Sequence, residues 1–162
     1  APMIGIMSDS HDNIPAIRQA VEFFNRQAVA FVVHAGDIVA PFSAKELLNL
    51  RMPLIVVFGN NDGEKNGLRK ILPQIIEPPL ATTVDGLNVF ITHHLSDTQA
   101  AMPSDVQVVM HGHTHACDVR RKGHVLFVNP GETCGWLTGH RTVALLDPQQ
   151  MECRILNLEA PQ

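Results

Sequence analysis

Five short apolar runs, each followed by side chains that can bind a metal ion, constrain this chain more than any other feature. The runs are rich in β-branched and aliphatic residues and are bounded by Gly, Asn, Asp or His, a pattern typical of buried strands. They cover residues 4–7, 31–33, 54–58, 89–91 and 106–110. In layered α/β folds, the loops after the carboxyl ends of the strands converge on ligands. The pattern therefore predicts an α/β fold with one site built from several loops.

The polar residues that follow these runs form a set of oxygen and nitrogen donors. In chain order they are Asp9-Ser10-His11, Gly36-Asp37, Gly59-Asn60, His93 and Gly112-His113-Thr114-His115. Asp9 and His11 are two residues apart, so in an extended segment both side chains lie on one face and can reach one cation. His113 and His115 repeat that spacing, which makes each pair a candidate metal clamp.

Each of these features also has an ordinary structural explanation. Asp37 fits a turn or cap residue, and Asn60 fits a turn residue that tolerates a left-handed backbone. A single strand-end His commonly satisfies a hydrogen bond. Those explanations do not account for five consecutive strand ends that all carry metal-binding side chains, so the set as a whole favours one metal site.

The order of the motifs, D-x-H, G-D, G-N, H and G-H-x-H, resembles the signature of the calcineurin-like metallophosphoesterases. The resemblance extends from Met3 to about Leu158 and is closest to the small single-domain bacterial and archaeal phosphodiesterases related to the retromer subunit of eukaryotes. Asn129-Pro130-Gly131, after a predicted strand over 125–128, is a further match. The resemblance implies a four-layer αββα sandwich of two mixed β-sheets flanked by helices, in a single domain over residues 1–162.

The same resemblance implies a role for each donor. Asp9, His11 and His115 would hold one metal ion, Asn60, His93 and His113 would hold the second, and Asp37 would bridge the two. Carboxylate, amide and imidazole donors without cysteine suit divalent transition metals, with Mn favoured and Ni, Fe, Zn or Co as alternatives, better than Ca or Mg alone. Two such ions can clamp a phosphoryl group and supply a bridging hydroxide that attacks phosphorus.

The chain departs from the family pattern at Asn61, where many members have the His that protonates the leaving oxygen and small relatives often have Cys. An amide cannot act as a general acid, a role typically worth about 10²- to 10⁴-fold, but Asn60 or Asn61 can stabilise phosphate by hydrogen bonding. His94 is the nearest candidate for a replacement acid or phosphate contact, although a solvent-exposed loop His is the simpler interpretation. Asp62 matches the family's acidic position and would orient a neighbouring group, or it begins a helix expected over 63–76.

Composition limits the partners. The chain has 162 residues, of which 45% are hydrophobic and 17% charged, which suits one ordinary globular domain. Its formal net charge is −4 and its basic residues are scattered, whereas a protein that grips an extended nucleic acid presents a broad basic face. A small phosphate ester is therefore the expected substrate, and a homodimer is compatible with the sequence.

Cysteine usage and hydropathy bear on location. Cys117, Cys134 and Cys153 are widely spaced and form no C-x-x-C pair, which fits reduced thiols. No apolar stretch approaches the ~18 residues that span a bilayer, and the N-terminal residues show no export signal. These observations predict a cytoplasmic location without a membrane partner.

Periodicity and turn residues predict the remaining elements. Helices are expected over 14–27 and about 42–50, alternating with the first three strands as βαβ units. The second half is predicted to form three hairpins. Their strand pairs are 81–84 with 87–92, 118–121 with 125–128, and 142–146 with 152–156.

One hypothesis and two alternatives follow. The hypothesis is a dinuclear metal-dependent phosphoric ester hydrolase. No Arg lies near the proposed ligands in the sequence, and a dianionic monoester profits from an extra cation, so a phosphodiesterase is favoured over a monoesterase. One alternative is a catalytically weak metal-binding scaffold or protein-interaction module, marked by a contiguous exposed apolar patch. The other is a nucleotide sensor, which would bind its ligand tightly without hydrolysis.

Overall fold

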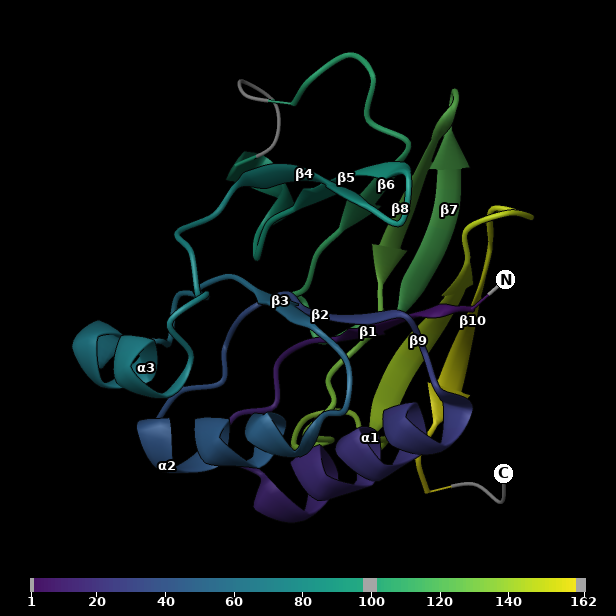
Figure 1. The fold of residues 1–162 in the computed structure, drawn as a ribbon. Helices are drawn as coiled ribbons and strands as arrows, with labels where there is room; N and C mark the ends of the chain where they lie inside the picture. The colour runs from purple at the N-terminus through teal and green to yellow at the C-terminus, as the bar shows by residue number, and fades with distance from the viewer. Residues whose placement is uncertain (1, 98–101, 160–162) are drawn as a thin grey trace.

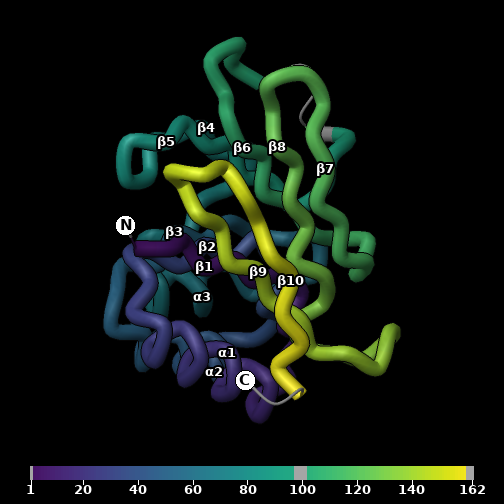
Figure 2. Tube along the Cα trace, turned by 90° about the vertical axis from the view of Figure 1, so that its right-hand side faces the viewer, coloured from purple at the N-terminus to yellow at the C-terminus, as the bar shows by residue number. Residues whose placement is uncertain are grey.

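Two five-stranded sheets and three α-helices make up the fold in the computed structural model, which describes residues 2–97 and 102–159 (Figure 1). In Figure 2, helices α1 and α2 lie below the first sheet and the second sheet lies above it. Both sheets contain parallel and antiparallel strand pairs. The expected sandwich of two mixed sheets flanked by helices is confirmed.

The first sheet has the strand order β10-β9-β1-β2-β3. Its strands are β1 (Ile4–Met7), β2 (Phe31–His34), β3 (Leu54–Val56), β9 (Thr142–Asp147) and β10 (Glu152–Asn157). Strands β1, β2 and β3 run parallel, which brings their carboxyl ends to one edge of the sheet. The antiparallel hairpin β9–β10, predicted from the sequence, pairs with β1 and completes the sheet.

Helix α1 (Ile14–Gln27) is the crossover between β1 and β2, with the bounds predicted from the sequence. Asn13 caps it by accepting a hydrogen bond from the Ala16 amide at 3.2 Å. Pro15 lies in the first turn, where the helix needs no amide donor. The apolar face, which includes Phe24, packs against the first sheet, so α1 fixes the segment between Met7 and Asn13 that carries the D-x-H motif.

The other helical segments are shorter than predicted. The expected second helix is a single turn, α2 (Pro41–Ala44), which continues as the 3-10 helix η1 (Lys45–Asn49). The expected third helix is α3 (Lys65–Ile71). Pro73 explains its early end, because proline has no amide hydrogen and disfavours helical backbone in the residue before it.

The second sheet has the strand order β4-β5-β6-β8-β7. Its strands are β4 (Leu80–Val84), β5 (Leu87–Ile91), β6 (Val108–Met110), β7 (Asp118–Lys122) and β8 (Val125–Asn129). The hairpins β4–β5 and β7–β8 are those predicted from the sequence. Strand β6 runs parallel to β5, so the loops that follow these two strands leave the sheet at the same edge.

Apolar cores join the layers. One core lies between the helices and the first sheet, and a second lies between the sheets, where Ile6 of β1 and Met110 of β6 are both fully buried. On the outer face of the second sheet, Leu95 of the short 3-10 turn η2 (Leu95–Asp97) packs against the cluster that contains Phe90. None of the helices within the described ranges is long and apolar enough to cross a membrane.

Candidate metal centre

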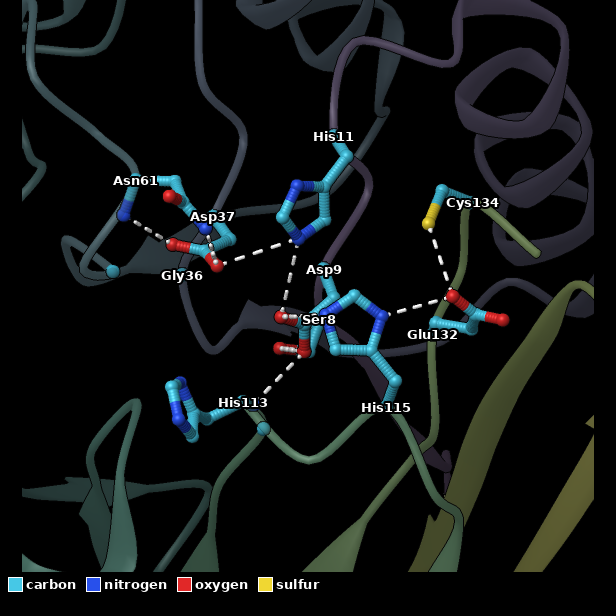
Figure 3. Close-up of polar contacts among 12 residues, drawn as sticks. Ser8, Asp9, His11, Gly36, Asp37, Asn61, His113, His115, Glu132 and Cys134 are labelled. Atoms are coloured by element: carbon cyan, nitrogen blue, oxygen red, sulfur yellow. Dashed lines mark hydrogen bonds and ion pairs between the residues drawn. The ribbon is translucent and has the colours of Figure 1, made fainter. Parts of the chain in front are cut away.

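Loops from five strands bring the predicted donors together at one edge of the sandwich. Figure 3 shows Asp9, His11, Asp37, His113 and His115 among them. Strands β1, β2 and β3 of the first sheet and β5 and β6 of the second each contribute a loop. The side chains that these loops carry are Asp9, His11, Asp37, Asn60, His93, His113 and His115. Motifs that are far apart in the sequence thus lie close together, because the parallel strands of the two sheets pack against each other.

The first group of donors surrounds Asp9. The Nε2 atoms of His11 and His115 both lie 3.5 Å from Asp9 Oδ1. One donor atom from each of the three residues lies within 4.8 Å of the others, which is compatible with binding one metal ion. These three residues are those assigned to the first ion from the sequence.

Asp37 lies between this group and His93. Its Oδ2 atom is 3.3 Å from His11 Nε2 and 3.2 Å from His93 Nε2. Asp9, Asp37 and His93 form a second set whose donor atoms lie within 4.8 Å of one another. Asp37 thus lies near histidines assigned to different ions, and its bridging role stays a prediction.

Asn60 and His113 lie together next to His93. The Nδ1 atom of His113 is 3.1 Å from Asn60 Oδ1, and the rings of His93 and His113 meet edge to face with centroids 5.3 Å apart. The His113 amide also donates a hydrogen bond to Asp9 Oδ2 at 3.1 Å. The structure thus brings the three donors assigned to the second ion next to one another.

Five of these residues adopt a backbone conformation that residues other than glycine rarely take. The φ angles are 53° at Asp9, 38° at His11, 64° at Asp37, 75° at His113 and 66° at His115. Left-handed backbone at such residues costs on the order of 1–3 kcal/mol each and persists only where the surroundings impose it. Its concentration at converging strand ends points to a functional site.

The donor atoms and the local field fit divalent cations. Asp9 Oδ1, His11 Nε2 and His93 Nε2 are buried and have no hydrogen-bond partner within the described part of the chain. The nearby Asp37 carboxylate, and then that of Asp9, raise the pKa of His11 to about 9. Burial alone would raise the pKa of Asp37, but His11 and His93 hold it well below the ordinary range. The carboxylates therefore create a field that favours positive charge.

Hydrogen bonds to Nδ1 orient the rings of two of the histidines. His93 Nδ1 is 2.8 Å from the carbonyl oxygen of Ala35, and His115 Nδ1 is 2.8 Å from Glu132 Oε1. Because a carbonyl or carboxylate oxygen can only accept, Nδ1 carries the hydrogen in each ring and the Nε2 lone pair faces the centre. This arrangement is common for metal-binding histidines, whose second nitrogen donates to an oxygen.

Glu132 is a functional residue that the sequence did not reveal. It is buried, and it accepts hydrogen bonds from the amides of Leu137 and Thr138 as well as from His115. Burial raises its pKa, but Thr138 and His115 hydrogen bonds outweigh that effect and hold the pKa at about 2. The one signal in the sequence is its place directly after the N-P-G motif over 129–131, which is part of the family resemblance.

Glu132 also lies near Cys134, and with His115 the three could group around an ion. Burial raises the pKa of the Cys134 thiol to about 12, so the thiolate that a metal requires is disfavoured. The Glu132 oxygens already accept several hydrogen bonds. We therefore assign Glu132 to the orientation of His115.

Asp62 holds two loops together. Its oxygens accept hydrogen bonds from the amides of Asp37, Val39 and Gly59 at 2.7 to 2.9 Å. Helix α3 begins only at Lys65, so the alternative prediction that Asp62 starts a helix is wrong. Gly59 permits the close approach of these loops, since a Cβ there would lie 2.1 Å from Asp37 Oδ1.

Asn61 and His94 lie at the edge of the centre. Asn61 donates to Asp37 twice, from its amide at 2.8 Å and from its side chain at 2.9 Å. His94 is exposed, accepts a hydrogen bond from the Ser96 amide at 3.0 Å, and has its ring centroid 4.3 Å from that of His113. A role for either residue in proton transfer stays a prediction.

His34 lies beneath the centre as a neutral, buried residue. Its Nδ1 accepts a hydrogen bond from the Gly36 amide at 3.1 Å, so its Nε2 carries the hydrogen and donates to Ser10 Oγ at 3.0 Å. Desolvation by burial lowers its pKa to about 4. His34 thereby fixes the residue between Asp9 and His11.

Comparison with known proteins decides the family. A model of the calcineurin-like phosphoesterase superfamily domain matches residues 3–151 of the chain. The chain belongs to the calcineurin-like phosphoesterase superfamily. It is 43% identical over 164 residues to phosphodiesterase MJ0936 of Methanocaldococcus jannaschii, and the match covers 96% of this chain and 99% of that protein.

Solved structures agree with this family. An archaeal phosphodiesterase superposes with a TM-score of 0.87 at 41% sequence identity, covering 96% of this phosphoesterase and 99% of that chain. Vps29 of Chaetomium thermophilum superposes with a TM-score of 0.68 at 15% identity, covering 97% and 94% of the two chains, and shares the fold alone. This protein is therefore a metal-dependent phosphoesterase.

A cavity of about 500 Å³ adjoins the second group of donors in this phosphoesterase. Its walls include Asn60, His93 and His113, together with His94 and Lys65. Lys65 forms an ion pair with Glu77 at the rim. The sequence did not predict a basic residue at the site. Lys65 is the first residue of α3, and only the fold brings it to the cavity.

Proposed function

We propose that this phosphoesterase is a phosphodiesterase that acts through two divalent metal ions on a small phosphate ester. The observation that carries the proposal is the position of Asp37 Oδ2, between His11 Nε2 at 3.3 Å and His93 Nε2 at 3.2 Å. One carboxylate thus lies within reach of two separate sets of donors. The similarity to phosphodiesterase MJ0936 supports the choice of diesters.

In this proposal, each residue has one task. Asp9, His11 and His115 would hold the first ion, Asn60, His93 and His113 would hold the second, and Asp37 would serve both. When bound, the ions neutralise phosphoryl charge and lower the pKa of a water molecule so that it can attack at neutral pH. The mixed oxygen and nitrogen donors favour Mn, with Ni, Fe, Zn and Co as alternatives.

The residues around these donors position them. Glu132 and the Ala35 carbonyl orient the rings of His115 and His93, and the Asn61 side chain donates a hydrogen bond to Asp37 Oδ2. Asn61 cannot protonate a leaving oxygen. The enzyme should therefore prefer esters whose leaving group departs without a proton, such as nitrophenolate.

The alternative of a protein-binding scaffold is less well supported. The large apolar side chains that are exposed among the described residues come from α2, η1, β7 and two separate loops. They are Phe42, Leu48, Ile76, Val119, Trp136 and Leu137.

The free state of all three cysteines agrees with the cytoplasmic location that we propose.

Steady-state hydrolysis tests the function. Bis(p-nitrophenyl) phosphate and p-nitrophenyl phosphate are compared after chelation and re-addition of Mn, Ni, Zn or Mg, with His113→Ala as the control. We expect metal-dependent hydrolysis of the diester, faster than that of the monoester and abolished by the substitution. Binding of two ions without turnover of either ester would contradict the proposal and favour the scaffold or the nucleotide sensor.

A further inference from the structure

The loop between β8 and β9 exposes two large apolar side chains beside the first group of donors. Trp136 is 63% exposed and Leu137 is 76% exposed. Trp136 is the single tryptophan of the sequence, which contains no tyrosine. A large apolar side chain in water is ordinary by itself, so its placement and its rigidity decide whether it has a role.

The loop is tied to the metal centre through Glu132. The carboxylate that orients His115 also accepts hydrogen bonds from the amides of Leu137 and Thr138. Within the loop, the Gly139 amide donates to the Gly135 carbonyl at 3.1 Å. The position of the loop is therefore fixed by the same buried side chain that fixes a proposed metal ligand.

The indole ring of Trp136 is held at the rim of the centre. Its Nε1–H donates to the backbone carbonyl of His11 at 3.1 Å, and the imidazole of His11 faces Asp9 and Asp37. The only polar atom of the indole is thus satisfied within the protein. What remains exposed is the apolar π surface, held beside His11, one of the proposed metal ligands.

We propose that Trp136 stacks against a planar ring carried by one ester group of the substrate. This inference rests on the proposed function, and it narrows the substrate to phosphate esters with an aryl or heterocyclic group, nucleotides included, over esters with small alkyl groups. Stacking of a base on an aromatic side chain is worth about 1–3 kcal/mol, or roughly 5- to 150-fold in affinity. The cavity beside His113 leaves room for the second ester group.

A comparison of AMP with ribose 5-phosphate separates the contribution of the ring from that of the phosphate, because ribose 5-phosphate lacks the base. We expect AMP to quench the fluorescence of Trp136 in the metal-loaded protein and to bind about tenfold more tightly than ribose 5-phosphate. Because no other tryptophan or tyrosine contributes, the signal reports on this side chain alone. Equal quenching and equal affinity for the two ligands would overturn the proposal.

Competitive inhibition of diester hydrolysis extends the test to variants. Trp136→Ala should lose the preference for AMP while its inhibition by ribose 5-phosphate is unchanged, and Trp136→Phe should recover part of the preference. Leu48→Ala, an exposed apolar residue on η1, serves as the control and should keep it. A full preference in Trp136→Ala would contradict the proposal.

The fluorescence measurement needs no turnover, so it separates this inference from the proposed function. Quenching by AMP in a protein that hydrolyses neither nitrophenyl ester would support the stacking site and overturn the phosphodiesterase proposal. Metal-dependent hydrolysis without discrimination between AMP and ribose 5-phosphate would support the phosphodiesterase proposal and overturn the stacking site.

Discussion

The two halves of the metal centre are built differently. On the side of Asp9 and His115, a buried carboxylate contacts a histidine that Glu132 orients from behind. On the side of Asn60 and His113, an amide oxygen and an imidazole line a cavity of about 500 Å³. The first half has the features of a site that retains its ion, and the second half has those of a site that meets the substrate.

This difference has a simple physical basis. A charged oxygen donor in a buried, hydrogen-bonded surrounding binds a cation more strongly than a neutral amide oxygen beside solvent. An open coordination side, in turn, is what a catalytic metal site needs. We therefore expect unequal affinities for the two ions, with Asp37 as the side chain that couples them.

Removing the shared carboxylate should have the largest effect. Asp37→Ala deletes a carboxylate within reach of both halves, so kcat for bis(p-nitrophenyl) phosphate should fall on the order of 10³-fold, together with the metal content. Steady-state kinetics and elemental analysis on the same sample check this. Retention of two ions with near-normal kcat would show that the halves do not depend on Asp37.

Acidification should weaken the support beneath the first half. His34 has a folded-state pKa of about 4 against an ordinary 6.5, so between these pH values the unfolded chain binds the proton and the folded chain does not. The free energy of unfolding should therefore fall as pH drops from about 6.5 to about 4, by roughly 3 kcal/mol from this group. Urea unfolding across that range, compared with His34→Gln, measures it; equal pH slopes would exclude His34 as the cause.

A general acid added to the second half should change the ester preference. Asn61→His places an imidazole at the family's acid position, so we expect turnover of esters with poor leaving groups to rise on the order of 10²-fold, at the low end of general acid catalysis. Rates for an alkyl phosphodiester and the nitrophenyl diester are compared. Asn61→Ala, which only removes the 2.9 Å hydrogen bond to Asp37, controls for loss of contact. An equal response of both esters would contradict the role of a missing acid.

Loosening the support of His115 should affect the first half alone. Glu132→Gln keeps the shape but removes the charge, and metal affinity should fall about 10- to 100-fold at one of the two sites. Isothermal titration with Mn distinguishes the sites, and His94→Ala, on the other side of the centre, is the matched control. A loss at both sites would show that Glu132 supports the whole centre.

The smallest effect is expected at the cavity rim. Lys65 is partly exposed and ion-paired with Glu77, so Lys65→Ala should raise KM for the diester only about threefold and leave kcat unchanged. Steady-state kinetics at low and high salt check this. A change in kcat would place Lys65 closer to the reacting phosphate than the structure indicates.

Much of this fold was predictable because its signals are local. The buried strands, the start of α1 at Asn13 and Pro15, and all three hairpins follow from patterns within a few residues. The predicted helix over 63–76 is wrong in its length, because Pro73 ends α3 at Ile71. The single-domain prediction for 1–162 includes residues 1, 98–101 and 160–162, which lie outside the described part of the chain.

The sequence predicted only those site residues that belong to recognisable motifs. Asp9, His11 and the histidines of G-H-x-H stand in recognisable motifs, whereas Glu132 and Trp136 act through hydrogen bonds to residues that are far away in sequence. Such contacts arise only when β8 has packed beside β6 and the following loop has folded over the centre. The place of Glu132 after the N-P-G motif marks its position, but sequence spacing does not reveal these contacts.

The most direct test of the unequal halves is a stepwise titration of the metal-free enzyme with Mn, recording bound metal and diester hydrolysis in the same samples. We expect two equivalents of bound Mn. The first should bind tightly and give little activity, and hydrolysis should rise with the second, weaker equivalent. A single equivalent at saturation, or full activity with the first, would contradict a dinuclear centre with one retaining and one substrate-facing site.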